Sequence, residues 1–287
     1  MNFRLFTIED RNLIERYSSE KLGWENSFAC IWAWNVRGGH EIAEFDDFVI
    51  LKNLYGEKIL FSAPYAVNND AFLRGMDEIK RYCKENGVNH PVVNLSKEQA
   101  ELLNPDEYEI STNRNSYDYV YNTSDLISLS GKKYHSKRNF IKRFKDKYEF
   151  EFRDYEEDDY DGVCQLFDTW LEGRDPDSVN IERTALVRTL ECHKKLNTVS
   201  AVLTVDGKII GFSAGEVVGK VGHTLFEKAD VSFEGVYPTL NNLFAQTYYK
   251  DTKYINRQED MGLEGLRKAK LSYHPIILVE KYSAKLK

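Results

Sequence analysis

The strongest constraint on the fold is an order of strands and helices that occurs twice along the chain. A short strand pattern at 3–6 precedes a helical pattern at 7–17, and the same succession starts again at 152–155. A shift of 149 residues aligns Phe3 with Phe152, Arg4 with Arg153, Phe6 with Tyr155 and Asp10 with Asp159. We therefore expect two copies of one structural unit.

The order of elements after each start indicates the fold class. Each half continues with a helix, a meander of antiparallel strands, a helix, a strand, a further helix and a final strand. That order is an α+β layout and is typical of a GNAT-like acyltransferase fold. The sequence predicts two tandem GNAT-like domains, each a mainly antiparallel mixed sheet flanked by helices. We place them at 1–122 and 150–287, with a basic linker helix at 123–149.

The charge of the chain is unevenly distributed. Its 287 residues carry a net charge of −7, which excludes a globally basic nucleic-acid coat. The segment 132–147 nevertheless holds eight Lys and Arg, with Tyr134, Phe140, Ile141 and Phe144 near helical spacing. We expect an amphipathic helix between the two halves. Its cations either bind nucleic-acid phosphates or form a solvated face that pairs with the acidic run at 154–161.

Cysteine and histidine usage predicts neither a disulfide framework nor a metal site. Four cysteines lie far apart without a CxxC pair, and six histidines are scattered without HxH or HExxH spacing. The N-terminus has no apolar leader, and the longest apolar stretch is far shorter than the roughly 20 residues of a membrane span. We expect reduced thiols and a cytoplasmic chain without a transmembrane segment.

A first candidate motif ends the central strand of the second half. HTLFEKAD at 223–230 places Glu227, Lys228 and Asp230 within four residues, where they could supply a general base or an acid that binds an ammonium group. A strand-edge ion pair is the alternative. The following stretch lacks the Gly-rich turn with which acyl-CoA enzymes bind pyrophosphate, because Gly235 stands alone beside Glu234. We therefore predict no cofactor.

A second candidate motif lies at 255–275. A strand leads through Asn256, Arg257 and Asp260 to a turn at Gly262, and the next helix carries further cations. Arginine offers a planar fork for phosphate or carboxylate, and acids can hold a substrate amine. Helix capping explains some of these charges but not Arg257 on the strand side.

The stretches 129–144, 223–245 and 255–282 together resemble the family of the phosphatidylglycerol lysyltransferase C-terminal domain. The resemblance implies a cleft between the domains that receives the aminoacylated 3′ end of a tRNA, whose ester is attacked by a hydroxyl or an amine. It assigns catalytic roles to Glu227, Asp230 and Asp260. It assigns substrate or phosphate binding to Lys133, His135, Lys137, Arg138, Asn139, Lys228, Asn241, Asn256, Arg257, Arg267 and Lys270. The membrane enzymes of the family carry a multi-span region that this sequence lacks, so a lipid acceptor is not expected.

The sequence thus predicts an aminoacyltransferase-like protein that uses aminoacyl-tRNA as its donor, with an unidentified acceptor. Two alternatives remain open. One is an acyl-CoA-dependent N-acyltransferase with a degenerate CoA loop, and the other is a non-catalytic module that binds RNA or a partner on the same scaffold.

Overall fold

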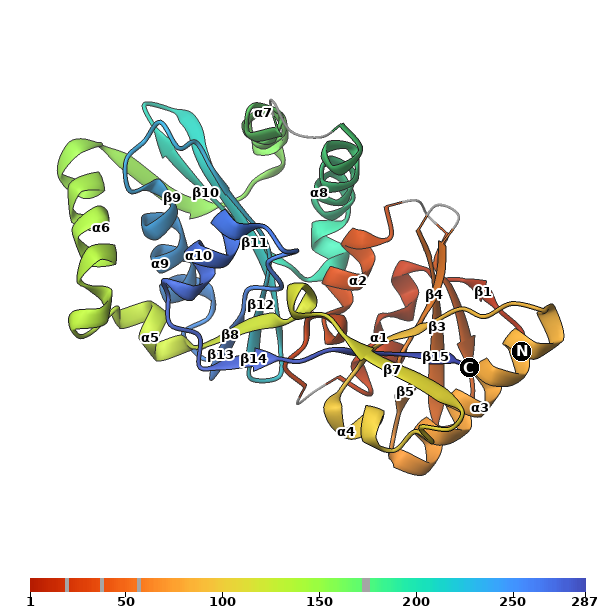
Figure 1. Cartoon of the computed structure of the whole chain (residues 1–287). Coiled ribbons are helices and arrows are strands. Elements are labelled where there is room, and N and C mark those ends of the chain that lie inside the picture. The colour runs from red at the N-terminus through yellow and green to blue at the C-terminus, as the bar shows by residue number, and fades with distance from the viewer. Residues whose placement is uncertain (19–20, 37–38, 56–57, 172–175) are drawn as a thin grey trace.

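The chain forms two mixed sheets flanked by helices, shown for the computed structural model in Figure 1. The structure describes residues 1–18, 21–36, 39–55, 58–171 and 176–287, and for Tyr55 and 176–179 the backbone alone. The predicted α+β class is confirmed. No helix among the described residues is long and apolar enough to cross a membrane.

The first sheet contains strands from both ends of the chain. Its neighbours follow in the order β1, β2, β3, β4, β6, β15, β7, and β5 pairs with β3. The pairing of β4 with β6 is parallel, whereas the others are antiparallel. The strands are β1 (Arg4–Leu5), β2 (Glu41–Glu44), β3 (Phe48–Tyr55), β4 (Lys58–Ser62), β5 (Tyr65–Ala66), β6 (Val92–Leu95), β7 (Tyr108–Thr112) and β15 (Tyr282–Leu286).

The second sheet runs in the order β14, β8, β13, β12, β11, β10, β9. Its parallel pairing joins β12 to β13. The strands are β8 (Asp118–Asn122), β9 (Phe150–Asp154), β10 (Val199–Val205), β11 (Lys208–Val218), β12 (Val221–Ala229), β13 (Tyr254–Asn256) and β14 (Ile277–Val279).

Helices cover the faces of both sheets. The longest in the first half begins at the N-cap Asn68, whose side chain accepts a hydrogen bond from the amide of Ala71, and ends at Gly87 with φ of 63°. The helices are α1 (Arg11–Glu15), α2 (Phe28–Trp34), α3 (Asn69–Asn86), α4 (Lys97–Glu101), α5 (Thr123–Ser128), α6 (His135–Lys147), α7 (Tyr160–Leu171), α8 (Pro176–Leu196), α9 (Val236–Tyr248) and α10 (Glu264–Leu271).

The predicted repeat has a matching ion pair in each half. Arg4 donates to Asp10 through both terminal nitrogens, and Arg153 donates to Asp159 in the same way at 2.6 and 2.7 Å. Each aspartate also accepts a hydrogen bond from the backbone amide of the residue three positions before it. These contacts close the turn from a strand into a helix, which explains why an arginine and an acid recur 149 residues apart.

The two sheets exchange strands across the predicted domain boundaries. The strand β8 lies before residue 123 but pairs with β13 and β14 of the second sheet. The final strand β15 pairs with β6 and β7 of the first sheet. Figure 1 shows β7 and β8 running beside β14 and β15 through the middle of the molecule. The boundaries at 122 and 150 stay a prediction, but the sheets do not follow them strand by strand.

A buried ion pair joins the two crossing segments. Asp118 begins β8 and Lys281 precedes β15, and Lys281 Nζ lies 2.8 Å from Asp118 Oδ1. Neither side chain has appreciable exposure, at 0% for Asp118 and 4% for Lys281. Burial in isolation would cost each charge several kcal/mol, so the pair depends on further hydrogen bonds. Asp118 obtains them from the amide of Trp24 and the side chain of Asn256.

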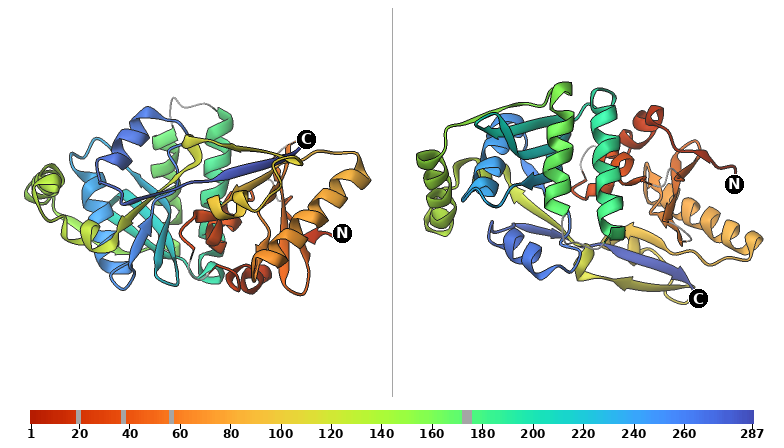
Figure 2. Two further views of the ribbon diagram at one scale, coloured as in Figure 1. Left: turned by 60° about the horizontal axis from the view of Figure 1, so that its bottom comes forward. Right: turned by 90° about the horizontal axis from the view of Figure 1, so that it is seen from above.

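The N-terminal helices pack against the second half. One apolar core contains Phe28 of α2 together with Phe167 of α7 and Phe212 of β11, and α2 contacts α8 directly. Figure 2 shows α7 and α8 standing together beside this region. The two repeat units therefore share a core instead of meeting across a thin interface.

The basic helix α6 does not lie between the halves, which corrects the expectation from the sequence. Figure 1 shows it at the edge of the molecule away from the first sheet. Its buried residues Ile141 and Phe144, with Tyr134 just before it, pack toward α9 and the second sheet. Phe140 is exposed instead. The apolar stripe is therefore used within the second half, and the cations of the helix other than Lys137 are exposed.

Replacing Lys281 with Met should lower the free energy of unfolding by about 3–5 kcal/mol, because Asp118 is left as a buried unpaired charge. Urea unfolding monitored by circular dichroism measures the change. Replacing the exposed Lys285 with Met should cost less than about 0.5 kcal/mol. A loss below about 1 kcal/mol for Lys281→Met would show that the pair does not hold the crossing strands.

Candidate functional site

Strands β12 and β13 separate in the middle of the second sheet. They pair from Val221 with Tyr254 to His223 with Asn256, after which β13 ends and β12 continues to Ala229. A register shift near Leu225 bends β12 at this point. The side chain of Gln258 bridges the gap, donating to the Thr224 carbonyl at 2.7 Å. Backbone groups of a central strand thus become reachable by a side chain or a ligand.

Glu227 forms the centre of a polar cluster beside this separation. Its Oε1 lies 2.7 Å from Arg257 Nη2, and its Oε2 accepts a hydrogen bond from Asn241 Nδ2 at 2.8 Å. Glu227 comes from β12, Asn241 from α9 and Arg257 from the segment after β13. The fold therefore brings together three of the residues that the sequence singled out.

Tyrosines and a lysine surround the guanidinium group of Arg257. It lies 4.8 Å from the ring centroid of Tyr273 and 5.9 Å from that of Tyr121. Lys137 of α6 places its ammonium 3.9 Å from the Tyr273 ring and 2.7 Å from Ser272 Oγ. Burial and the neighbouring Arg257 lower the pKa of Lys137 to about 8. Lys137 is thus the residue of α6 that joins this cluster.

Two polar atoms of the cluster are buried without a hydrogen bond. They are Nη1 of Arg257, a donor, and Oδ1 of Asn241, an acceptor. An unmade buried hydrogen bond costs about 1–3 kcal/mol, so such atoms in one site call for a ligand or an ordered water. A group that accepts from Arg257 and donates to Asn241 would satisfy both.

Asp260 and Arg267 form a separate structural clamp. Arg267 donates to both carboxylate oxygens of Asp260 at 2.8 and 2.9 Å, and the Gly262 amide and the Tyr119 hydroxyl also donate to Asp260. These interactions, with Arg267 first, hold the pKa of Asp260 well below its usual range. Such a carboxylate is a poor base, so the geometry favours a role in shaping the turn before α10.

Lys270 holds the loop that carries Arg257. Its ammonium donates to the carbonyl oxygens of Arg257, Gln258 and Glu259. Burial and the nearby guanidinium of Arg257 lower its pKa to about 8. All three donor positions of Lys270 are therefore used by backbone, and the residue positions the loop rather than a phosphate.

The remaining predicted residues lie away from this cluster. The side chain of Arg138 donates to the Leu129 and Gly131 carbonyls, and Asp230 binds Lys208 and its own turn at Ser232. Lys228 points to the opposite face of the sheet, where it meets Glu182 and the Trp170 ring. The other three predicted residues, Lys133, His135 and Asn139, are exposed on or just before α6.

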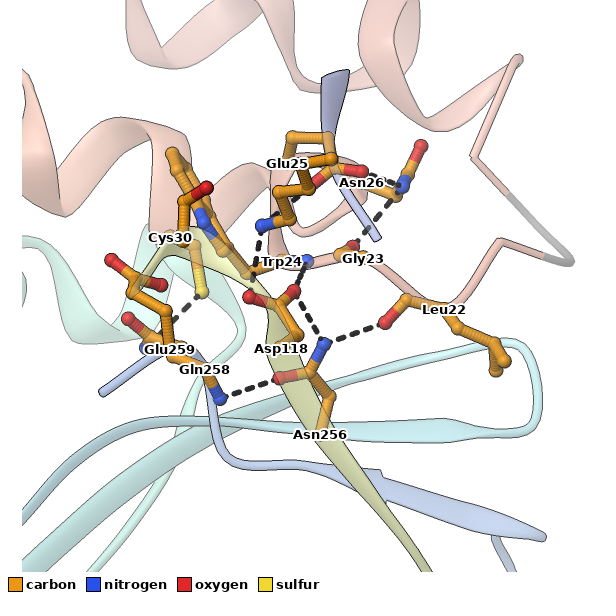
Figure 3. Close-up of polar contacts among 12 residues, drawn as sticks. Leu22, Gly23, Trp24, Glu25, Asn26, Cys30, Asp118, Asn256, Gln258 and Glu259 are labelled. Atoms are coloured by element: carbon orange, nitrogen blue, oxygen red, sulfur yellow. Dashed lines mark hydrogen bonds and ion pairs between the residues drawn. The ribbon is translucent and has the colours of Figure 1, made fainter. Parts of the chain in front are cut away.

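A second polar cluster occupies the α2 side of the same sheet (Figure 3). Asn256 donates to Asp118 and to the Leu22 carbonyl, and Lys281 contacts both Asp118 and Glu25. Asn256 thus belongs here and not beside Glu227, although it directly precedes Arg257. The sequence motif therefore supplies residues to both faces.

Sequence reasoning missed Tyr121, Tyr273, Gln258, Asp118 and Lys281. Tyr121 and Tyr273 follow ordinary core patterns, Asp118 is a single charge in an apolar strand, and Lys281 follows Glu280 just before β15. A charge at an inward position of a strand was the available signal, because a buried charge needs a partner.

His223 is fully buried beside these charges, and neither ring nitrogen makes a hydrogen bond. Burial lowers its pKa from 6.5 to about 4. Between pH 6.5 and about pH 4 the unfolded chain therefore binds more protons at this histidine than the folded protein does. The free energy of unfolding should fall as the pH drops through this range. From pH 7 to pH 5 this histidine alone should cost about 2 kcal/mol.

The matching measurement is urea unfolding of the wild type and of His223→Phe at both pH values. The variant should lose about 2 kcal/mol less between pH 7 and pH 5, whatever its stability at pH 7. Equal losses in the two proteins would contradict a buried neutral His223.

Comparison with known proteins shows which chains have a similar fold or sequence. A structure of a conserved protein of unknown function from Bacteroides thetaiotaomicron is 30% identical, covers both chains fully and has a TM-score of 0.93. The structure of L-PGS from Bacillus licheniformis matches 98% of this chain and 92% of that chain, with 14% identity and a TM-score of 0.70. The latter likeness concerns the fold alone.

An uncharacterised protein of Mycoplasmoides gallisepticum is 26% identical over 195 residues, which is 67% of this chain and 60% of the relative. The match thus spans less than two thirds of that protein. A tandem GNAT protein from the clavulanic acid biosynthesis pathway covers 99% of this chain and 98% of that chain, with 6% identity and a TM-score of 0.53. The fold of that protein and the two mixed sheets of this chain agree with the predicted tandem GNAT-like architecture.

A family model matches residues 16–285, nearly the whole chain, and thus both polar clusters around the separated strands. This match confirms the resemblance drawn from the three sequence stretches. The chain belongs to the family described as phosphatidylglycerol lysyltransferase, C-terminal.

Proposed function

We propose that the chain transfers an aminoacyl group from aminoacyl-tRNA to an acceptor, with the aminoacyl group held by Glu227, Asn241 and Arg257. The observation that carries this proposal is the pair of unsatisfied buried atoms, Arg257 Nη1 and Asn241 Oδ1, on either side of the Glu227 carboxylate. An aminoacyl ester offers a carbonyl oxygen that accepts from arginine. It also offers an ammonium group that donates to the amide oxygen and the carboxylate.

The chemistry follows from these roles. The acceptor's amine or hydroxyl attacks the ester carbonyl carbon, and the bond from that carbon to the tRNA 3′ oxygen breaks. The acceptor loses a proton and the departing 3′ oxygen gains one, so the transfer is balanced without a cofactor. Arg257 stabilises the charge that develops on the carbonyl oxygen, and Glu227 fixes the orientation of Arg257.

The packing of α6 argues against acyl-CoA as the donor. GNAT-type enzymes bind pyrophosphate at the N-terminus of the helix that follows the central strand, which corresponds to α9 here. Gly235 caps that end with φ of 85°, and a Cβ there would collide with the backbone carbonyl of Phe140 in α6. Glu234, which pairs with Arg143 of α6, adds a negative charge beside it. A pyrophosphate group at this end of α9 would therefore meet the backbone carbonyl of Phe140 and the carboxylate of Glu234.

The exposed face of α6 suits a tRNA backbone. Lys142, Lys145 and Lys147 are exposed there, and Lys132 is exposed just before the helix. Among the ion pairs of the described residues, none joins α6 to the acidic run at 154–161, whose partners include Arg153 and Lys194. Lys137 extends this positive surface inward to the Glu227 cluster. The helix could thus position the tRNA acceptor end toward the proposed site.

Replacing Arg257 with Lys should lower the transfer rate about 100-fold, because lysine keeps the charge but loses the planar fork that contacts both Glu227 and the ester. The assay measures formation of aminoacyl hydroxamate from aminoacyl-tRNA with hydroxylamine as a surrogate acceptor, above the uncatalysed rate. Asp230→Asn, at the end of the same strand, should stay within about twofold of the wild type. The assignment fails if Asp230→Asn is the slower variant.

Reversing Lys142 and Lys145 to Glu should weaken binding of aminoacyl-tRNA at least about tenfold at low salt. It should also reduce the slope of log Kd against log salt by about 2. Fluorescence anisotropy with a labelled aminoacyl minihelix measures both quantities. The control reverses the exposed Lys84 and Lys97 of the first half, which changes the net charge equally. Similar losses in both double variants would mean that α6 is not the tRNA-binding surface.

A further inference from the structure

A cavity of about 340 Å³ lies between the first sheet and the N-terminal segment that packs on the second. Its walls come from β3 and β4 with Asn53 and Ser62, from α2 with Trp34, and from the connection between β7 and β8 with Asn113. Glu227, Asn241 and Arg257 do not line it. The cavity is therefore distinct from the site proposed for the aminoacyl group.

One ammonium group at the cavity wall is shared by two carboxylates. Glu25 and Lys281 are its charged lining residues, and His40 is kept neutral because burial lowers its pKa to about 4. Lys281 is shared with Asp118, so two carboxylates face one ammonium group. Glu25 Oε2 lies 3.0 Å from Lys281 Nζ but has no partner in hydrogen-bonding geometry. A further cation in the cavity would balance this group.

Aromatic rings supply the rest of a site for a cation. Trp24, Trp34, Tyr65 and Tyr282 line the cavity. Ring faces attract ammonium groups, and a carboxylate among aromatic rings is a common arrangement for binding them. Hydroxyl and amide groups of Ser62, Asn53 and Asn113 can orient the uncharged part of such a molecule. By contrast, no lining cation is left over for a phosphate group, because Lys281 already serves two acids.

The cavity is close to the proposed transfer site through a short chain of contacts. Lys281 and Asp118 lie between the cavity wall and Asn256, whose side chain binds Asp118 at 2.9 Å. Asn256 directly precedes Arg257. A molecule in the cavity would therefore lie on the opposite side of the separated strands from the aminoacyl group.

We propose that this cavity binds a small ammonium-bearing molecule, such as an amino alcohol or a diamine. Building on the proposed function, this molecule is the acceptor. Its ammonium group is anchored by Glu25 and the aromatic rings, and its hydroxyl or second amine is the nucleophile. The chemistry of the lining thus selects a small cationic acceptor over a phosphate head group.

The test measures binding without tRNA, by NMR of the indole groups in protein labelled with 15N-tryptophan. Ethanolamine should shift the Trp24 and Trp34 signals saturably and leave Trp170, which lies beside Lys228 on another part of the protein, unchanged. Ethylene glycol and glycerol 3-phosphate should bind at least tenfold more weakly. Glu25→Gln should weaken ethanolamine binding at least tenfold, whereas the exposed control Glu85→Gln should not.

A second variant guards against a loss of folding in Glu25→Gln. Ser111 is exposed at the cavity, so Ser111→Trp should block ethanolamine binding while the protein stays folded. Equal or tighter binding of ethylene glycol or glycerol 3-phosphate would overturn the inference, as would unchanged binding in Glu25→Gln. Binding of ethanolamine without aminoacyl transfer to it, in a protein that does transfer the group to hydroxylamine, would overturn the acceptor role. A protein that transfers the group to neither would instead count against the proposed function.

Discussion

The buried ion pair between Asp118 and Lys281 is the interaction on which the rest of the structure depends. It lies where β8 enters the second sheet and β15 enters the first, so it fixes the exchange of strands between the two repeat units. The same carboxylate holds the turn at Trp24 and the side chain of Asn256. Asp118 is therefore linked through Lys281 to the cavity and through Asn256 to the loop that carries Arg257, which Lys270 also holds.

The separation of β12 and β13 gives the second sheet two chemically different sides. On the α9 side, Glu227, Asn241 and Arg257 form a site with an unsatisfied donor and an unsatisfied acceptor. On the α2 side lie the Asp118 pair and the cavity. On the proposed function, the aminoacyl-tRNA and the acceptor molecule approach one reaction centre from opposite sides of this sheet. Gln258 occupies the gap between them in this structure.

Local patterns predicted most elements of the fold, but not which sheet each strand joins. The capped helix ending at Gly87 and the paired Arg and Asp of each half follow from local sequence. The membership of β8 and β15 does not, because alternation of apolar residues specifies a strand without naming its neighbour. The alternation did contain a usable signal at 227–228, since adjacent residues of a strand point to opposite faces. This alternation places Glu227 on the face with Arg257 and Lys228 on the face with Glu182.

The account is tested most directly by a structure of the protein with a stable analogue of the tRNA 3′ end, in which an amide replaces the aminoacyl ester. We predict that the aminoacyl carbonyl lies within hydrogen-bonding distance of Arg257 Nη1, with its ammonium group near Glu227 and Asn241. Binding of the aminoacyl group on the outer face of α6, or in the cavity beside Glu25, would contradict the account.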